Sequence, residues 1–504
     1  MNREGMISRV RNRRAPYDII IIGGGATGAG CALDAAARGY DVLLLEQYDF
    51  GKGTSSRSTK LVHGGVRYLE QGNISLVREA LKERGILKQN APHLIRNQTF
   101  IIPCYSWWQK FYYGIGLKVY DLLSGGYSLG RSKMLSRTDT LNKLPNLRSE
   151  GLSGGVSYFD GQFDDARLLI ELINAAAENG AAVLNYARVV GLSKNTEGKT
   201  KGVKFECGLS GESFAAGAKV VINATGAFTD EIRKLASPDS EDLVTQSQGI
   251  HLVFDPSFLS SDEAIMIPKT SDGRVLFAIP WNGKTLIGTT DTPIGKADPE
   301  PHPLESEIGF ILETVSQYLS DPPTRKDVLS AFAGIRPLVK NSSAKNTASL
   351  SRDHTIETDE TNLLTITGGK WTTYRHMAED AIDRAAKIGK LAAAECVTHS
   401  IRIKSGRPDE IEKMKNELPV LAEKLHKDFE YLKADVVYAV RNEMAQTVED
   451  VLARRTRILF LDAQVANGIA PVVAKIMAVE MDKDQDWIKR QLEEFEKLAR
   501  NYLI

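Results

Sequence analysis

Residues 18–28 read Asp-Ile-Ile-Ile-Ile-Gly-Gly-Gly-Ala-Thr-Gly, an apolar strand followed at once by a Gly-x-Gly-x-x-Gly turn. In such a turn Gly23 permits the tight bend, Gly25 lets the backbone approach a pyrophosphate, and Gly28 lets the next helix pack on the strand. The amide hydrogens and the positive dipole end of that helix favour bound phosphate. The stretch therefore predicts a strand–turn–helix unit that binds a dinucleotide.

The second strand is predicted over Asp41 to Leu45 and is followed by Glu46. A carboxylate at this position can accept hydrogen bonds from both ribose hydroxyls, and its charge would repel a 2′-phosphate. Turn, helix and terminal acid together indicate dinucleotide binding. They do not distinguish FAD from NAD.

Length and composition limit the class of protein. A chain of 504 residues is too long for one hydrophobic core and predicts two or three domains. Lys plus Arg equals Asp plus Glu at 64 each, so no bulk charge indicates nucleic acid as a partner. The four cysteines lie far apart, which favours a reducing compartment and predicts neither a disulfide framework nor a metal site. No apolar run approaches the roughly 20 residues of a membrane span.

The chain divides into three predicted segments. Residues 1–17 form a basic N-terminal arm, interpreted as a poorly ordered tail, with a targeting remnant or a lipid-binding arm as alternatives. Residues 18–400 form the α/β body, with strands predicted at 219–224, 274–280, 285–288 and 363–367 and a helix at 164–179. Ser-Gly-Arg-Pro at 405–408 marks a boundary, and 405–504 has helical spacing and few glycines.

A run of motifs follows the glycine turn in a fixed order. Residues 53–70 read Gly-Thr-Ser-Ser-Arg-Ser-Thr-Lys-Leu-Val-His-Gly-Gly-Val-Arg-Tyr-Leu-Glu. Later come Asn-Ala-Thr-Gly at 223–226, Gly-Ile-Arg-Pro-Leu at 334–338 and Gly-Gly-Lys-Trp-Thr-Thr-Tyr-Arg at 368–375. Over nearly the whole chain this set resembles the FAD-dependent glycerol-3-phosphate dehydrogenase family, within the amino-acid-oxidase-like flavoproteins. The sequence lacks the calcium-binding loop of the animal members.

The resemblance implies an α/β fold with a Rossmann-like FAD-binding domain, an interleaved α+β substrate domain and a C-terminal helical domain. It implies non-covalent FAD, so His63 is interpreted as a loop histidine beside the flavin, with a covalent link as the alternative. The predicted cofactor-binding residues are Gly23, Gly25, Gly28, Glu46, Thr54, Ser55, Ser56, Ser58, His63, Gly64, Gly65, Ala224, Thr225, Gly226, Gly368, Gly369 and Lys370.

The implied reaction oxidises sn-glycerol 3-phosphate to dihydroxyacetone phosphate, with hydride transfer to FAD. Guanidinium groups of arginine bind a dianionic phosphate well, because they offer two parallel, permanently charged donors. An alcohol donates hydride only once its oxygen begins to carry negative charge, which the site must stabilise. The predicted substrate-binding residues are Arg67, Tyr68, Arg336, Arg352 and Lys370, and the predicted catalytic residues are His251, Arg336 and Lys370. His251 is the leading candidate for the base, with a hydrogen-bonded core histidine as the alternative.

The electrons are then expected to pass to a membrane quinone, either ubiquinone or menaquinone. Residues 107–120 mix aromatic, apolar and lysine side chains, which suits an anchor at a membrane surface, although core packing explains the same composition. The expected location is cytoplasmic and peripheral on the inner membrane, or at the mitochondrial inner membrane. The oligomeric state stays open, with a homodimer as one alternative.

Other functions compete with this interpretation. A glycerol-3-phosphate oxidase, which reduces oxygen to hydrogen peroxide, shares the motifs and is the nearest alternative. An amine oxidase would need a carboxylate-binding arginine rather than several phosphate-suited cations. A flavin-binding protein that has lost turnover would be favoured by a missing active-site cation, and none is missing from the set. An NAD-dependent dehydrogenase would leave the motifs at 53–70 without a role.

Overall fold

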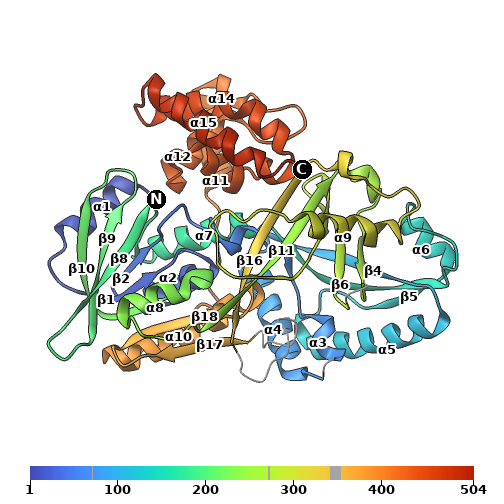
Figure 1. Cartoon of the computed structure of the whole chain (residues 1–504), viewed down its shortest axis with the longest axis horizontal. Helices are drawn as coiled ribbons and strands as arrows, with labels where there is room; N and C mark the ends of the chain where they lie inside the picture. Colours follow the sequence, from blue (N-terminus) through green and yellow to red (C-terminus); the bar gives the residue numbers. More distant parts are fainter. Residues whose placement is uncertain (71, 271–272, 341–352) are drawn as a thin grey trace.

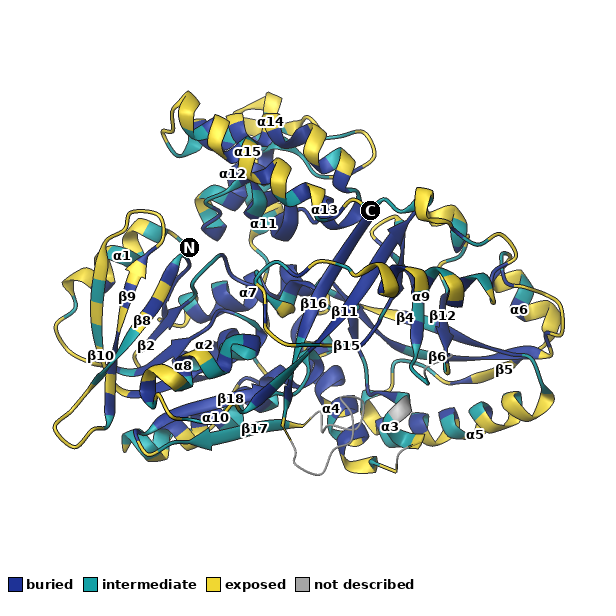
Figure 2. Ribbon diagram, in the orientation of Figure 1, coloured by how far each residue is buried: buried dark blue, intermediate teal, exposed yellow. Residues whose placement is uncertain are grey.

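The computed structural model describes residues 1–70, 72–270, 273–340 and 353–504, with the side chain of Arg67 outside the description. Two sheet-containing parts lie side by side, and a helical part made by the C-terminal residues sits above their junction (Figure 1). The strands are largely buried, whereas the outer faces of the helices are exposed (Figure 2).

The first sheet carries the predicted dinucleotide unit. Its central strand β1 (Tyr17–Ile22) runs parallel to β2 (Val42–Leu45) on one side and to β10 (Ser213–Asn223) on the other. The order across the sheet is β17-β18-β10-β1-β2-β7, and β8 and β9 extend β10 as an antiparallel ribbon. The remaining strands are β7 (Ala182–Leu184), β8 (Ala187–Lys194), β9 (Thr200–Cys207), β17 (His354–Thr358) and β18 (Leu363–Gly368).

Helices cover one face of this sheet. The helix α2 (Ala26–Ala37) packs between α7 (Asp165–Glu178) and α10 (Tyr374–Gly389). The alanines of α2 let α7 and α10 pack close to it. Apolar side chains of these three helices form one core with side chains of β1 and β2. The short α8 (Thr229–Ala236) lies toward the other face, where Ile232 joins a second core.

The second sheet follows the order β15-β11-β14-β13-β12-β4-β6-β3, with β16 paired to β11 and β5 paired to β6. Its long members are β4 (Ile95–Cys104), β6 (Gly154–Phe163), β11 (Val244–Phe254) and β16 (Ser330–Val339). Its shorter members are β3 (Leu61–Val62), β5 (Lys133–Leu135), β12 (Ala264–Ile267), β13 (Leu276–Trp281), β14 (Lys284–Gly288) and β15 (Thr292–Ile294). The helices around it are α3 (Val66–Glu70), α4 (Ile74–Asn90), α5 (Trp107–Ser124), α6 (Arg137–Lys143) and α9 (Glu305–Ser316).

The chain crosses between the two sheets repeatedly. Strands β1 and β2 lie in the first sheet, β3 to β6 in the second, β7 to β10 in the first, β11 to β16 in the second, and β17 and β18 in the first again. This alternation confirms the interleaved α/β fold. The predicted strands at 274–280, 285–288 and 363–367 and the predicted helix at 164–179 are also confirmed within about two residues at each end. The predicted strand at 219–224 is confirmed as the end of the longer β10, which begins at Ser213.

The C-terminal part is helical. It contains α11 (Arg407–Glu417), α12 (Lys433–Glu443), a π-helix (Asp450–Arg455), α13 (Ile458–Leu461), α14 (Ala463–Glu480) and α15 (Gln485–Arg500). Its apolar side chains form one continuous core with residues of the second sheet. The helical part is therefore joined to the body by hydrophobic burial as well as by the chain.

The N-terminal residues differ from the expected poorly ordered tail. They form α1 (Arg3–Asn12), and the side chain of Asn2 caps it by accepting a hydrogen bond from the Gly5 amide. Val10 is buried against the first sheet, and Arg11 donates hydrogen bonds to the Glu212 carboxylate. The capping residue and the apolar stripe order this segment, because they give the helix a face to bury.

A cluster of buried charges joins the helical part to the segment after β2. The carboxylate of Asp49 accepts two hydrogen bonds from Arg455, at 2.7 and 2.9 Å, and one from Arg454 at 2.6 Å. All three side chains are buried. Burial alone would raise the pKa of Asp49, but the charges of Arg455 and Arg454 outweigh it and lower that pKa to about 2.

We expect Asp49→Asn to lower the free energy of unfolding by about 3–5 kcal/mol, because it leaves buried arginine charges without their counter-ion. Since the pKa of Asp49 is lowered on folding, its contribution is complete above the unfolded pKa and is lost as the pH falls from about 4 toward 2. Urea unfolding followed by circular dichroism at pH 7 measures the effect.

Glu212→Gln is the matched control, because Glu212 pairs with Arg11 at the surface. Such exposed pairs contribute about 0–1 kcal/mol. Equal unfolding midpoints for Asp49→Asn and the unmodified protein would contradict a stabilising role for the buried cluster.

Candidate active site

The glycine turn after β1 brings strand, turn and helix closer together than side chains would allow. Gly23 has a φ of +108°, and a Cβ there would lie 2.6 Å from the carbonyl oxygen of Ala224. A Cβ on Gly28 would lie 1.8 Å from the carbonyl oxygen of Gly23. The helix α2 begins next to Gly25, which offers no side-chain cap. The start of α2 is thus a site where backbone amides can meet phosphate oxygens.

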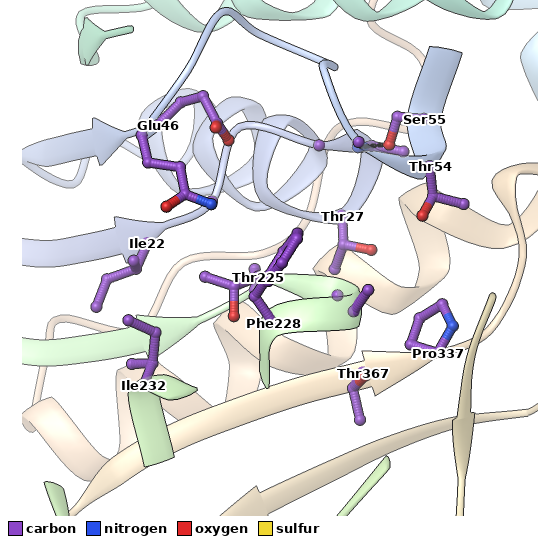
Figure 3. Close-up of a pocket in the computed structure, with 18 of the residues that line it drawn as sticks. Ile22, Thr27, Glu46, Thr54, Ser55, Thr225, Phe228, Ile232, Pro337 and Thr367 are labelled. Carbon is purple, nitrogen blue, oxygen red and sulfur yellow. Dashed lines mark hydrogen bonds between the residues drawn. The ribbon is translucent and has the colours of Figure 1, made fainter. Parts of the chain in front are cut away.

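A cavity of about 450 Å³ opens at this helix start. Figure 3 shows Glu46 at one end and Thr54, Ser55 and Pro337 toward the other. Of the predicted cofactor-binding residues, the structure brings together at this cavity Gly23, Gly25, Glu46, Thr54, Ser55, Ala224, Thr225, Gly226, Gly368, Gly369 and Lys370.

Glu46 is fixed to the glycine turn. Its carboxylate accepts a hydrogen bond from the Gly24 amide at 2.7 Å and one from the Tyr48 amide at 2.9 Å. Burial raises the pKa of Glu46, and these amide hydrogen bonds offset only part of the rise. A carboxylate has about four acceptor positions, so Glu46 can still accept hydrogen bonds from ribose hydroxyls.

The loop over residues 53–65 does not lie wholly on this cavity. In the described part of the chain, Ser56, Ser58 and Gly64 line neither this cavity nor its neighbour. The Ser58 hydroxyl donates instead to the buried carboxylate of Asp165 at 2.6 Å. The hydrogen bond to Asp165 turns Ser58 inward, and the contact of these three residues with the cofactor stays a prediction.

A second cavity of about 190 Å³ adjoins the first. Arg336 on β16 lines the second cavity and its neighbour Pro337 lines the first. Lys370 lines the first cavity, and its Nζ lies 3.9 Å from the centre of the Tyr68 ring, which lines the second. His63 and Gly65, both predicted at the cofactor, also line the second cavity.

Arg336 is held in a defined direction. Its guanidinium donates to the Thr290 carbonyl and to the Thr289 hydroxyl, each at 3.0 Å, and lies 3.6 Å from the Asp291 carboxylate. A Cβ on Gly249 of β11 would lie 2.4 Å from Arg336 Nη2, so the glycine makes room for the guanidinium. The neighbouring carboxylate moderates the positive charge at this wall without removing it.

In the part of the chain that the structure describes, His251 lines neither of the two cavities, and its buried position is that of the alternative expectation, a hydrogen-bonded core histidine. It is 2% exposed, and its ring stacks on Phe332 with 5.0 Å between ring centres. Its Nε2 lies 2.9 Å from Thr59 Oγ1, and it is Thr59 that lines the second cavity. Burial, followed by the charges of Lys60 and Arg336, lowers the pKa of His251 well below its ordinary value.

Sequence reasoning missed several polar residues of the second cavity, namely Thr59, Asp160, Arg274, Thr289, Thr290 and Asp291. Thr59 lies within the quoted loop, and Arg274 was assigned only to a strand. No local pattern marked Arg274, because its position on the cavity depends on how β13 pairs within the second sheet. The predicted Arg352 lies outside the described residues, and the side chain of Arg67 is also outside them.

Known proteins with similar sequences are FAD-dependent enzymes, in agreement with a dinucleotide cavity. A family model described as "FAD dependent oxidoreductase" matches residues 18–375, and one described as "C-terminal domain of alpha-glycerophosphate oxidase" matches residues 360–487. The mitochondrial glycerol-3-phosphate dehydrogenase of Homo sapiens is 40% identical over 100% of this chain and 75% of its own. The mitochondrial enzyme of Arabidopsis thaliana is 40% identical over 97% of this chain and 86% of its own.

A solved structure is similar over the same extent. It is the glycerol-3-phosphate dehydrogenase from Bacillus halodurans complexed with FAD, with a TM-score of 0.79 and 30% identity. The match covers 99% of this chain and 97% of that one. An L-alpha-glycerophosphate oxidase from Mycoplasma pneumoniae, at 17% identity and a TM-score of 0.60, shares the fold.

We expect Gly23→Ala to weaken FAD binding by at least about tenfold, since a side chain at positive φ costs on the order of 1–3 kcal/mol and the contact with Ala224 must also be relieved. Visible absorbance of the purified protein measures its FAD content. Gly309→Ala on α9 is the control, because a Cβ there meets open space. Full FAD occupancy of Gly23→Ala at limiting FAD would contradict the assignment.

Proposed function

Because the chain belongs to the FAD-dependent glycerol-3-phosphate dehydrogenase family, we propose that it oxidises sn-glycerol 3-phosphate to dihydroxyacetone phosphate and passes the electrons to a membrane quinone. The observation that carries the proposal is the pair of adjoining cavities, one built for a dinucleotide and the other lined by arginines. The named relatives at about 40% identity are dehydrogenases, which favours this reaction over the oxidase alternative.

The larger cavity fits FAD by the chemistry of its walls. The start of α2 suits the pyrophosphate and Glu46 suits the ribose. Gly368 and Gly369 have φ values of +79° and +70°, and this backbone carries Lys370 to the border of the second cavity. When bound, the flavin supplies the hydride acceptor. We assign Lys370 to the flavin end of the cavity, where its charge stabilises added electrons.

The smaller cavity suits a phosphorylated alcohol. Arg336 and Arg274 both line it, and guanidinium groups bind phosphate through planar, permanently charged forks. Tyr68 lines the same cavity beside Lys370, as the substrate-binding assignment requires. Arg67 and Arg352 remain predictions as further phosphate ligands.

The reaction requires the C2 hydroxyl to lose its proton, which leaves negative charge on the substrate oxygen, and hydride then leaves C2. Arg336 and Lys370 are the cations positioned to stabilise that charge. Among the described residues, the hydroxyl of Thr59 lies between the second cavity and the Nε2 of His251, so we assign the effect of His251 on the reaction to that side chain.

The helix α5 supports attachment to a membrane surface. Its exposed apolar side chains include Trp107 at 74% and Leu122 at 80% exposure. Figure 2 shows α5 at the edge of the second sheet with much of its length exposed. Among the residues that the structure describes, no helix combines the length and apolar character needed to cross a bilayer. We therefore propose that α5 lies in the membrane interface, on the cytoplasmic face of an inner membrane or at the mitochondrial inner membrane.

The function is tested by anaerobic mixing of the FAD-loaded protein with glycerol 3-phosphate. We expect rapid bleaching of the flavin absorbance, no bleaching with glycerol at equal concentration, and reoxidation by a quinone analogue. Arg336→Met should lower kcat/KM by at least about 100-fold with FAD retained, because the site loses a cation that acts on developing charge.

Arg325→Met is the control for loss of an arginine, because Arg325 pairs with Glu305 at the surface. A flavin that glycerol 3-phosphate does not reduce would exclude the proposed function. Reoxidation by oxygen with peroxide release, in place of the quinone analogue, would favour the oxidase.

The membrane assignment predicts that Trp107→Ser combined with Leu122→Ser reduces binding to anionic lipid vesicles by at least about tenfold, since each large apolar side chain contributes about 1.5–3 kcal/mol on burial. Co-sedimentation with vesicles measures this binding. Activity with a water-soluble electron acceptor should stay unchanged. Val479→Ser is the control, because Val479 is 81% exposed on α14, away from α5. Unchanged vesicle binding by the double variant would exclude α5 as the anchor.

A further inference from the structure

A threonine hydroxyl stands between His251 and the second cavity. Thr59 lines the cavity, and its Oγ1 lies 2.9 Å from His251 Nε2. Within the described residues, His251 lines neither cavity. A substrate in the second cavity can therefore contact the hydroxyl of Thr59 but not the imidazole behind it.

The surroundings of His251 favour a neutral ring. Phe332 covers one face, and the backbone of Gly288 lies so close that a Cβ there would be 2.3 Å from the ring. The charged groups that act on the ring are Lys60 and Arg336, both cations. A third positive charge between them would be repelled, and the ring is cut off from water as well. The imidazole therefore stays uncharged at neutral pH.

The unpaired nitrogen of the ring indicates which nitrogen carries the proton. His251 Nδ1 is buried and has no hydrogen-bond partner among the described residues. A buried N–H without an acceptor is rarer and less favourable than a buried lone pair without a donor. The proton therefore belongs on Nε2, where it is donated to Thr59 Oγ1.

This hydrogen bond fixes the direction of the threonine hydroxyl. With Thr59 Oγ1 accepting from His251, the hydroxyl's own proton must be donated elsewhere. In the described part of the chain, Thr59 Oγ1 has no other hydrogen-bond partner, and the open side of the residue is the second cavity. The hydroxyl is thus a neutral donor aimed into the substrate site.

We propose that Thr59 donates a hydrogen bond to the C2 oxygen of the substrate, and that His251 is a positioning residue that orients this hydroxyl rather than the base. The inference rests on the proposed function and deepens it. The guanidinium groups of the cavity suit the dianionic phosphate, and Thr59 adds a neutral donor to the cations that act on the alcohol oxygen. The C2 hydroxyl releases its proton to solvent water, and the electron pair of the C2–H bond then leaves as hydride to a bound flavin while the carbonyl forms. A donor aimed at the oxygen stabilises the negative charge that the oxygen carries once its proton has left.

The test separates the rate of flavin reduction from substrate binding by anaerobic stopped-flow mixing with glycerol 3-phosphate. Thr59→Val, which keeps the shape but removes the hydroxyl, should lower the limiting reduction rate about 100-fold or more and change the apparent Kd by less than about threefold. Thr59→Ser should restore the rate to within about tenfold of the unmodified protein. A Thr59→Val protein that reduces its flavin at the unmodified rate overturns the inference.

The two roles of His251 are distinguished by its substitutions. His251→Gln keeps an N–H donor toward Thr59 and should reduce its flavin much faster than His251→Leu, with an unchanged pH profile of the rate. If His251 were the base, both variants would be equally slow, and the proposal would be excluded.

A second measurement does not depend on turnover. Nuclear magnetic resonance of isotope-labelled histidine nitrogens, on the FAD-loaded protein without substrate, should show His251 protonated at Nε2 alone. Protonation at Nδ1 overturns the inference. Failure of glycerol 3-phosphate to reduce even the unmodified protein would instead reject the proposed function, so the two failures are distinguishable.

Discussion

The guanidinium of Arg457 fixes the segment on which both cavities depend. It donates hydrogen bonds to the Ser56 carbonyl and to the Asp165 carboxylate, and Lys60 donates to the same two groups. These side chains are buried, so removing Asp165 would leave two cations without their shared counter-ion in a medium of low dielectric. The path of the loop between β2 and β3 is therefore set by a residue of the helical C-terminal part.

This single loop contributes to both cavities. Thr54 and Ser55 line the larger cavity, and Thr59 and His63 line the smaller one a few residues later. Because one stretch of backbone supplies both sets, the position of a substrate relative to the cofactor is tied to the position of the loop. Arg457 lines neither cavity in the described part of the chain. It nevertheless lets the helical part support the site, because it holds the loop that lines both cavities.

The positive charge at the site comes from a few arginine and lysine side chains and not from the net charge of the chain. The formal net charge is zero, yet Arg274 and Arg336 converge on the small cavity and Lys370 stands at its border. Burial, opposed by Asp165 and reinforced by Arg457, lowers the pKa of Lys60 to about 7. Lys60 and Arg336 in turn lower the pKa of His251. A site that must stabilise negative charge is lined by cations and backed by the neutral His251.

The sequence by itself determined the glycine turn and the place of Glu46 beside it, because those constraints act within one strand–turn–helix unit. It also indicated the interleaved fold, through motifs whose order matches a known family. Only the tertiary structure decided that Ser58 turns inward to Asp165 and that Thr59 stands before His251. A loop without periodicity does not reveal which way its side chains point, and the partner of Thr59 lies 192 residues away, where sheet pairing alone brings it into contact.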